Sequence, residues 1–162
     1  IPLAKTIIHR ARQCVSPTYV EPFIKSVPNS WRRDMHYLAA GLWAAHWRDD
    51  HSSASMSIGK ACAVFDSARR KNMGQDDRTK TSSTEKRFVT LLDADSDQLP
   101  HRLRQMLALL KDQAIDFESL LQGLLKWNDE QKHTQNDWAR DYYRNLYHET
   151  NVEQQNNMEI SE

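Results

Sequence analysis

Apolar side chains recur every three or four residues over most of this chain, and this spacing constrains the fold more than any other feature. The clearest example lies between Gln98 and Asp112. Its stripe consists of Leu99, Leu103, Met106, Leu107 and Leu110. A helix turns by about 100° per residue, so these side chains share one face, which has to be buried against other elements.

Further segments repeat the helical pattern and have local start signals. The predicted helices are 32–47, 58–71, 83–92, 98–112, 117–124 and 131–148. Ser82, followed three residues later by Glu85, forms a capping box at the start of the third of these helices. Asp116 is placed to cap the fifth. The sequence therefore predicts helices joined by short polar connections.

The composition disfavours a sheet. The chain of 162 residues has four Gly and five Pro, and runs of β-branched residues are rare. We predict an all-α protein, an elongated bundle of about eight helices that can divide into two small lobes. The expected division is a single helical domain over 1–148, with an N-terminal lobe over about 1–72, a polar loop over 73–83 and a C-terminal lobe over 84–148. Residues 149–162 are rich in Gln, Asn and Glu, and we expect a disordered tail there.

Charge is balanced overall but divided along the chain. Residues 1–92 have 15 Lys/Arg and 8 Asp/Glu, a net +7, whereas residues 93–162 have 7 and 14, a net −7. This asymmetry is compatible with a polyanion on one side of the molecule, and equally with a solvated surface.

Cys14 and Cys62 form no CxxC pair, and no apolar run approaches 18 residues. We therefore expect a cytoplasmic protein with reduced thiols and no membrane contact.

Motifs for catalysis or metal binding are incomplete. Gly59-Lys60 resembles part of a phosphate-binding loop without its first glycine and its Ser/Thr. Asp93, Asp95 and Asp97 begin like a calcium loop, but Gln98 and Arg104 occupy the required Gly and Glu positions. The cluster His46, Asp49, Asp50 and His51 leaves open an all-α enzyme with a metal site, the least favoured alternative. We expect no enzyme, no cofactor and no metal.

Several basic residues lie where they can contact an anion. Lys86 and Arg87 occupy the start of a helix, where free N–H groups favour phosphate. Arg104 and Lys111 lie opposite the leucine stripe of their helix. Arg140 and Arg144 are one turn apart, and nearby Asp side chains can pair with them instead. Solvated faces and surface ion pairs remain the alternatives for all of these residues.

Four motifs in order resemble one known family over about residues 28–147. They are Ser57-Ile58-Gly59-Lys60-Ala61, Glu85-Lys86-Arg87-Phe88 with Leu91-Leu92-Asp93-Ala94, Leu99 with Leu103-Arg104 and then Trp127, and Trp138-Ala139-Arg140-Asp141-Tyr142-Tyr143. The chain resembles CasB, the small subunit of the type I-E CRISPR surveillance complex, Cascade. The Trp-Ala-Arg-Asp-Tyr-Tyr run is the most distinctive of the four motifs.

This resemblance implies a helical, non-catalytic subunit that stabilises the R-loop. Its implied partners are the large subunit, the repeated backbone subunits, a second copy of itself, the guide CRISPR RNA and the target DNA with its displaced strand. Carried onto this sequence, the resemblance implies seven candidates for contacts to phosphate. They are Arg33, Lys60, Lys86, Arg87, Arg104, Lys126 and Arg140. Helical spacing alone adds Lys111 and Arg144. We expect these residues to form one continuous groove, and Trp127, Trp138, Tyr142 and Tyr143 to pack between helices.

One further alternative is a helical scaffold that binds neighbouring proteins and makes no contact with nucleic acid. Its basic residues would pair with acidic protein surfaces. Binding to single-stranded DNA of arbitrary sequence, weakened by salt, would distinguish a nucleic-acid-binding subunit from such a scaffold.

Overall fold

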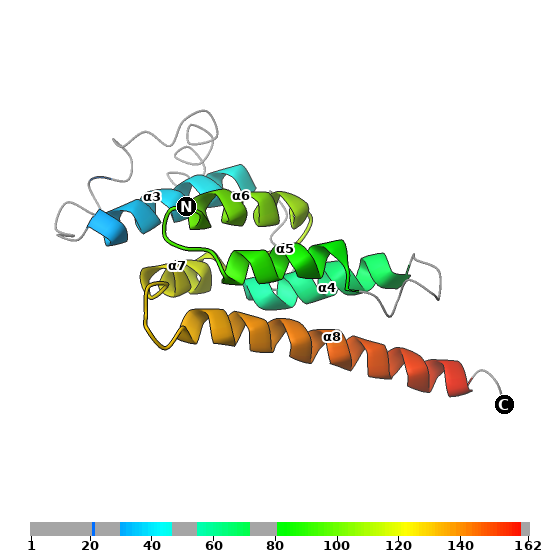
Figure 1. Ribbon diagram of the computed structural model, residues 1–162. Coiled ribbons are helices and arrows are strands. Elements are labelled where there is room, and N and C mark those ends of the chain that lie inside the picture. Colours follow the sequence, from blue (N-terminus) through cyan, green and yellow to red (C-terminus); the bar gives the residue numbers. More distant parts are fainter. Residues whose placement is uncertain (1–20, 22–29, 47–54, 72–80, 160–162) are drawn as a thin grey trace.

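Six helices form the described part of the chain in the computed structural model (Figure 1), which describes residues 21, 30–46, 55–71 and 81–159. They are α3 Ser30–His46, α4 Ile58–Lys71, α5 Ser83–Leu92, α6 Leu99–Leu109, α7 Phe117–Leu125 and α8 His133–Glu159. Apart from one isolated bridge between Met56 and Ile115, these residues contain no β-structure. The predicted all-α class is confirmed. The count of about eight helices is not, since six lie within the described ranges.

Local capping signals determine where two helices begin, as the sequence predicted. The Ser82 Oγ accepts a 2.9 Å hydrogen bond from the Glu85 amide at the start of α5. The Asp116 carboxylate accepts bonds of 3.1 and 3.0 Å from the amides of Glu118 and Ser119 at the start of α7. These side chains satisfy amide groups that have no partner within the helix.

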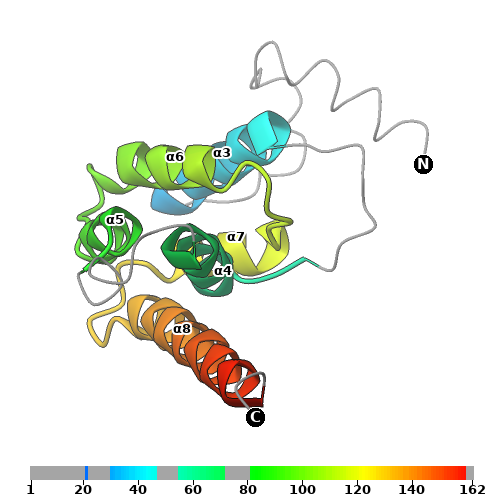
Figure 2. The same ribbon diagram turned by 90° about the vertical axis from the view of Figure 1, so that its right-hand side faces the viewer.

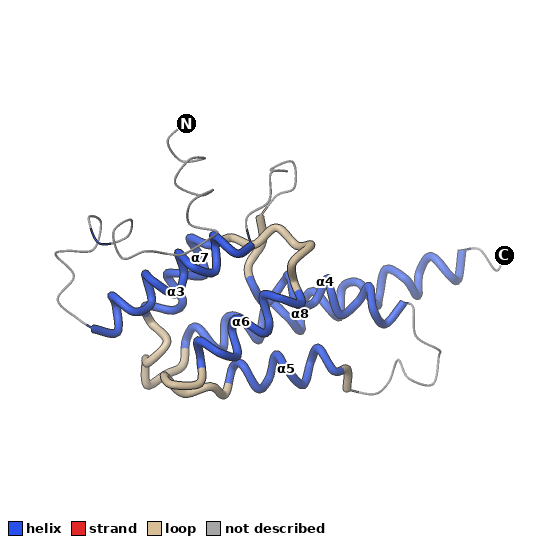
Figure 3. The backbone as a smooth tube through the Cα atoms, turned by 90° about the horizontal axis from the view of Figure 1, so that it is seen from above, coloured by secondary structure: helices blue, strands red, loops and turns tan. Residues whose placement is uncertain are grey.

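The helices lie in three layers. Figure 2 shows α3 beside α6 in one outer layer, α5, α4 and α7 in the middle, and α8 alone in the other outer layer. Seen from above, α5 and α6 run side by side (Figure 3). Figure 1 shows α8 lying along α4 and continuing past its end. This arrangement places the outer faces of α6 and α8 on opposite sides of the molecule.

The beginning of α4 approaches α8 closely because position 59 is a glycine. A Cβ atom there would lie 2.3 Å from the Trp138 carbonyl oxygen and 2.9 Å from the Asp141 Cβ. Ser57 Oγ donates a 2.6 Å hydrogen bond to Asp141 and accepts one of 3.3 Å from the Lys60 amide. The motif Ser57–Ala61 therefore joins α4 to α8.

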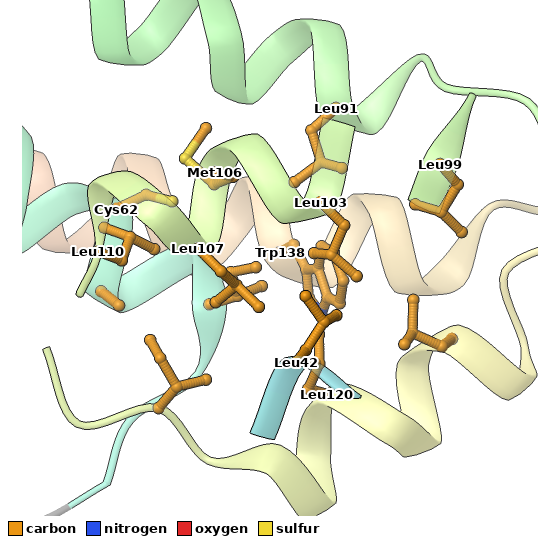
Figure 4. Close-up of a cluster of buried hydrophobic side chains, with 14 of the residues drawn as sticks. Leu42, Cys62, Leu91, Leu99, Leu103, Met106, Leu107, Leu110, Leu120 and Trp138 are labelled. Atoms are coloured by element: carbon orange, nitrogen blue, oxygen red, sulfur yellow. The ribbon is translucent and has the colours of Figure 1, made fainter. Parts of the chain in front are cut away.

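Each of the six helices contributes to one hydrophobic core, part of which is drawn in Figure 4. Its buried members include Met35, Leu42, Cys62, Phe88, Leu91, Leu103, Leu107, Leu120, Trp138 and Tyr142. The predicted leucine stripe is buried throughout: Leu99, Leu103 and Leu110 are fully inaccessible. The two segments predicted as lobes thus share a core.

The end of α8 differs from the sequence prediction. A helix over 131–148 followed by a disordered tail was expected, but α8 continues to Glu159. Extending an existing helix is much easier than nucleating one, and the added segment contains Gln and Glu, which are good helix formers. A polar segment can therefore remain helical without an apolar stripe of its own.

Candidate nucleic-acid interface

Eight of the nine predicted basic residues have exposed side chains, and Arg33 is partly buried. They lie on different helices. Lys86 and Arg87 are on α5, Arg104 is on α6, and Lys111 follows α6 directly. We name these four the α5–α6 surface. Their side chains are exposed to solvent, as binding of a polyanion requires.

A second group of basic residues lies on α8. Arg140 and Arg144 are exposed on α8, which forms the opposite outer layer (Figure 2). Lys60 lies in the first turn of α4, and Lys126 caps the end of α7. The helices that carry the nine residues lie in all three layers, and one continuous groove stays a prediction. Sequence periodicity places residues on a face of their own helix but not on a face of the molecule.

Arg33 is already paired within the chain. Its Nη2 lies 2.8 and 3.0 Å from the two carboxylate oxygens of Glu21. The hydroxyl of Tyr37 donates to the same carboxylate. The hydrogen bond and the charge of Glu21 raise the pKa of the Arg33 guanidinium. A phosphate would have to compete with the charge of Glu21 for this guanidinium.

Arg140 has a weaker partner. Its Nη1 lies 3.1 Å from Asp137 Oδ1, and the two side chains are 61% and 65% exposed. An ion pair in this environment contributes about 0–1 kcal/mol and is screened by salt. Such a pair can open when a phosphate approaches, so Arg140 is more available than Arg33.

A buried polar network connects α4, α5 and α8. The Asp66 carboxylate, fully inaccessible to solvent, accepts a 2.9 Å bond from Arg70 and a 2.8 Å bond from the Tyr142 hydroxyl. Arg70 also contacts Glu85 at 3.0 Å, and the Tyr143 hydroxyl donates to Glu85 at 3.3 Å. Burial, followed by the hydrogen bond to Asp66, raises the pKa of Tyr142. Glu85 and the two tyrosines of the family-like motifs therefore hold helices together.

The tryptophans also pack, as predicted. Trp127 and Trp138 are buried with their rings 5.3 Å apart, and the Trp127 Nε1 donates to the Ala94 carbonyl at 3.0 Å. Tyr143 is half-buried and meets Tyr142 edge-on.

Two residues were missed by sequence reasoning. Asp66 is a charged residue at the centre of the core, and Tyr147 is 67% exposed on α8.

An acidic recess of about 330 Å³ lies between the end of α5 and the start of α8. Its lining includes Asp93, Asp95, Asp129 and Glu130, with Lys132 beside them. The hydrogen bond from His133 holds the pKa of the Asp129 carboxyl below its usual value. Carboxylates in this number repel phosphate, so the charge of the recess disfavours contact with a nucleic-acid backbone.

The residues that the sequence singled out for metal binding have structural roles where they are described. Asp95 Oδ1 accepts bonds from the amides of Asp97 and Gln98 before α6. The His46 Nε2 lies 2.8 Å from the Gln113 carbonyl oxygen, whereas residues 49–51 fall outside the described residues. Within the described ranges, no group of three or more His, Cys, Asp or Glu side chains could hold a metal ion. None of the helices described is both long and apolar enough to cross a membrane.

The fold and its surfaces define a small helical protein with cations spread over outward-facing helices. Comparison with known proteins gives the family. Residues 5–143 match the family described as CRISPR-associated protein Cse2. The chain belongs to this family, and the resemblance seen in the sequence is confirmed.

Individual relatives support this family assignment. A CRISPR-associated protein Cse2 from Thermus thermophilus is 39% identical over 128 residues, which are 77% of this chain and 66%, just under two thirds, of that protein. The crystal structure of M. ruber CasB has 34% identity and a TM-score of 0.75, covering 91% of this chain and 89% of that one. A chain of a CRISPR RNA-guided surveillance complex has the same fold, with 20% identity, a TM-score of 0.64, and coverage of 92% and 96%.

Proposed function

We propose that this chain is the non-catalytic small subunit of a type I-E Cascade surveillance complex. The observation that carries this proposal is the family match over residues 5–143. The shared fold with a chain of a CRISPR RNA-guided surveillance complex supports it. In this role the chain works in the cytoplasm and contributes to antiviral defence. It contacts the large subunit, the repeated backbone subunits and a second copy of itself.

Its contribution within the complex is to hold nucleic-acid backbone and so stabilise the R-loop. The α5–α6 surface supports this role because Lys86, Arg87 and Arg104 are exposed on neighbouring helices and Lys111 is exposed in the turn after α6. Lys86 and Arg87 lie near the amino end of α5, whose dipole favours an anion. Contacts to phosphate are independent of sequence, which suits a complex in which guide pairing supplies specificity.

The second basic surface, on α8, extends the proposal from one nucleic-acid contact to two. The α5–α6 surface, on a middle and an outer helix, and the α8 surface can contact two separate backbone segments. In an R-loop these would be the hybrid of guide RNA and target DNA, and the displaced DNA strand. The remaining candidates are Lys60, Lys126 and Arg33, with Arg33 the weakest because Glu21 neutralises it.

A scaffold that binds proteins alone is the second candidate function. The acidic recess between α5 and α8 favours it, since four carboxylates offer a site for basic side chains of a neighbouring protein. The neutral net charge of the chain is also consistent with it. In that case this chain would not bind single-stranded DNA at any salt concentration.

Charge reversal on the α5–α6 surface tests the proposal. An assembled complex with Arg87→Glu and Arg104→Glu should have a shorter R-loop lifetime with the subunit still folded and incorporated. Arg69→Glu is the matched control, because Arg69 is exposed at the end of α4 and belongs to neither surface. An unchanged lifetime in a fully assembled double variant would remove the nucleic-acid role from these residues and favour the scaffold.

A further inference from the structure

Tyr147 is an aromatic side chain that is exposed to solvent and does not pack in the helical core. Among residues 30–46, 55–71 and 81–148, whose side-chain burial is described, two large hydrophobic residues are exposed, Val89 at 39% and Tyr147 at 67%. Elsewhere on α8 the aromatic residues pack inward: Trp138 and Tyr142 are 5% and 0% exposed. Its exposed ring is available to stack on a planar ligand, and the residues beside it decide which ligand suits the site.

Its neighbours on α8 indicate the chemistry of that occupant. Helical geometry places Tyr147 within about 20° of Arg140 and about 60° of Arg144 around the helix axis. Along the axis, Arg140 and Arg144 are about 6 Å apart, and Tyr147 lies about 4.5 Å further on. All three side chains are exposed, and α8, the helix that carries them, forms an outer layer of the molecule (Figure 2). A guanidinium pair and an aromatic ring therefore form one short line.

Single-stranded nucleic acid suits this line better than a duplex does. Its phosphates can pair with the guanidinium groups, and an unpaired base can stack on the phenol ring. In a duplex the base faces are covered by neighbouring bases, and an exposed ring has nothing on which to stack. The ion pair of Arg140 with Asp137 is exposed and can exchange for a phosphate.

We propose that Tyr147 stacks on an unpaired base of a single strand whose phosphates are held by Arg140 and Arg144. This inference rests on the proposed function and deepens it, because it assigns the α8 surface to single-stranded nucleic acid of arbitrary sequence. The displaced strand of the R-loop has this chemistry.

Three substitutions at one position test the stacking. In the assembled complex, Tyr147→Ala and Tyr147→Leu should weaken binding of an oligo-dT strand about tenfold, or about 1.4 kcal/mol, while Tyr147→Phe stays within about twofold of wild type. The dependence of affinity on salt should be unchanged in all three, since no phosphate contact is lost. Oligonucleotides with 5-iodouracil at successive positions should photocrosslink to Tyr147. Val89→Ala is the control for removing an exposed apolar group elsewhere.

Several results would overturn the inference. Wild-type affinity in Tyr147→Leu would show an apolar contact without stacking. Unchanged DNA binding with impaired incorporation of Tyr147→Ala into the complex would assign this side chain to a protein partner. If Arg87→Glu with Arg104→Glu shortens the R-loop lifetime and Tyr147→Ala leaves oligo-dT binding unchanged, stacking is wrong and the proposed function stands. If neither the R-loop lifetime nor oligo-dT binding changes, both the stacking of Tyr147 and the nucleic-acid role of the α5–α6 surface are wrong.

Discussion

The hydroxyl of Tyr142 on α8 donates a 2.8 Å hydrogen bond to Oδ2 of Asp66 on α4, and both side chains are fully buried. The two residues are 76 positions apart in sequence. Arg70 supplies the second hydrogen bond and the compensating charge for the same carboxylate oxygen. A buried carboxylate depends on such partners, since removing one leaves charge without compensation. The contact between α4 and α8 therefore depends on Tyr142.

Tyr142→Phe should destabilise the chain. The ring still fills its place, but Asp66 loses a hydrogen bond in a site that water does not reach. We expect the free energy of unfolding in urea to fall by about 1–3 kcal/mol. Tyr143→Phe is the control and should cost less than about 1 kcal/mol, because its bond to partly exposed Glu85 is 3.3 Å long. Equal losses in the two variants would contradict this account of the network.

Gly59→Ala should separate α4 from α8. The added Cβ would lie 2.3 Å from the backbone oxygen of Trp138, so a helix has to move. Alanine favours helix by up to about 1 kcal/mol, and we expect strain to exceed this gain, with a net loss of about 1–3 kcal/mol in urea unfolding. Gly123→Ala should cost less, since its Cβ would meet the Thr134 methyl at 2.9 Å and the Trp138 ring at 3.1 Å, both side-chain atoms. A stabilised Gly59→Ala variant would contradict the close approach.

Stability should decrease in alkaline solution because of Cys62. Burial, with a smaller contribution from the charge of Asp66, raises the pKa of this thiol. The unfolded chain then loses a proton above pH about 8.5, whereas the folded chain retains it. Since the folded state binds more protons, the free energy of unfolding falls as pH rises, by up to about 1.4 kcal/mol per pH unit for this group. Tyr142, whose pKa burial also raises, adds to the fall above pH about 10.

Urea unfolding of wild type and Cys62→Ala between pH about 8 and about 10 checks this expectation. The variant should be less stable at the lower pH, because a buried side chain is truncated, but its stability should depend less on pH. Parallel profiles for the two proteins would show that the thiol does not contribute to the alkaline slope.

Arg33 and Arg87 should differ in their effect on DNA retention. Arg87 is exposed, while Arg33 is paired with Glu21. In the assembled complex, Arg87→Gln should reduce the slope of log affinity against log salt by about 1, and Arg33→Gln should leave it unchanged. Glu21→Gln, which releases Arg33, tests the reason. A slope reduced by Arg33→Gln would show that the guanidinium leaves Glu21 to contact phosphate.

The sequence predicted what local interactions determine. The capping side chains of Ser82 and Asp116 act within three residues of their helix ends, and each was found in place. The leucine stripe of α6 follows from spacing along one helix, and it is buried. Local patterns did not indicate a family. The four motifs together did, and that family is confirmed over residues 5–143.

Contacts between distant segments were not predictable from such patterns. Asp66 stands among apolar residues of α4, and a partner that permits its burial lies on another helix. Arg33 looked available because Glu21 is 12 positions away. Periodicity placed Arg104 and Arg140 on exposed faces of their own helices but did not reveal that α6 and α8 lie in opposite layers (Figure 2). In the sequence Tyr147 resembles its buried neighbours, and its exposed fraction of 67% distinguishes it from them.

Retention of target DNA by complexes reconstituted with and without this chain, measured against salt, tests the central claim most directly. If the chain holds nucleic-acid backbone, its omission should shorten retention and flatten the salt dependence, because phosphate contacts are lost. If the complex assembles and retains DNA equally well without it, with the same salt dependence, the nucleic-acid role is contradicted and the scaffold becomes the better account.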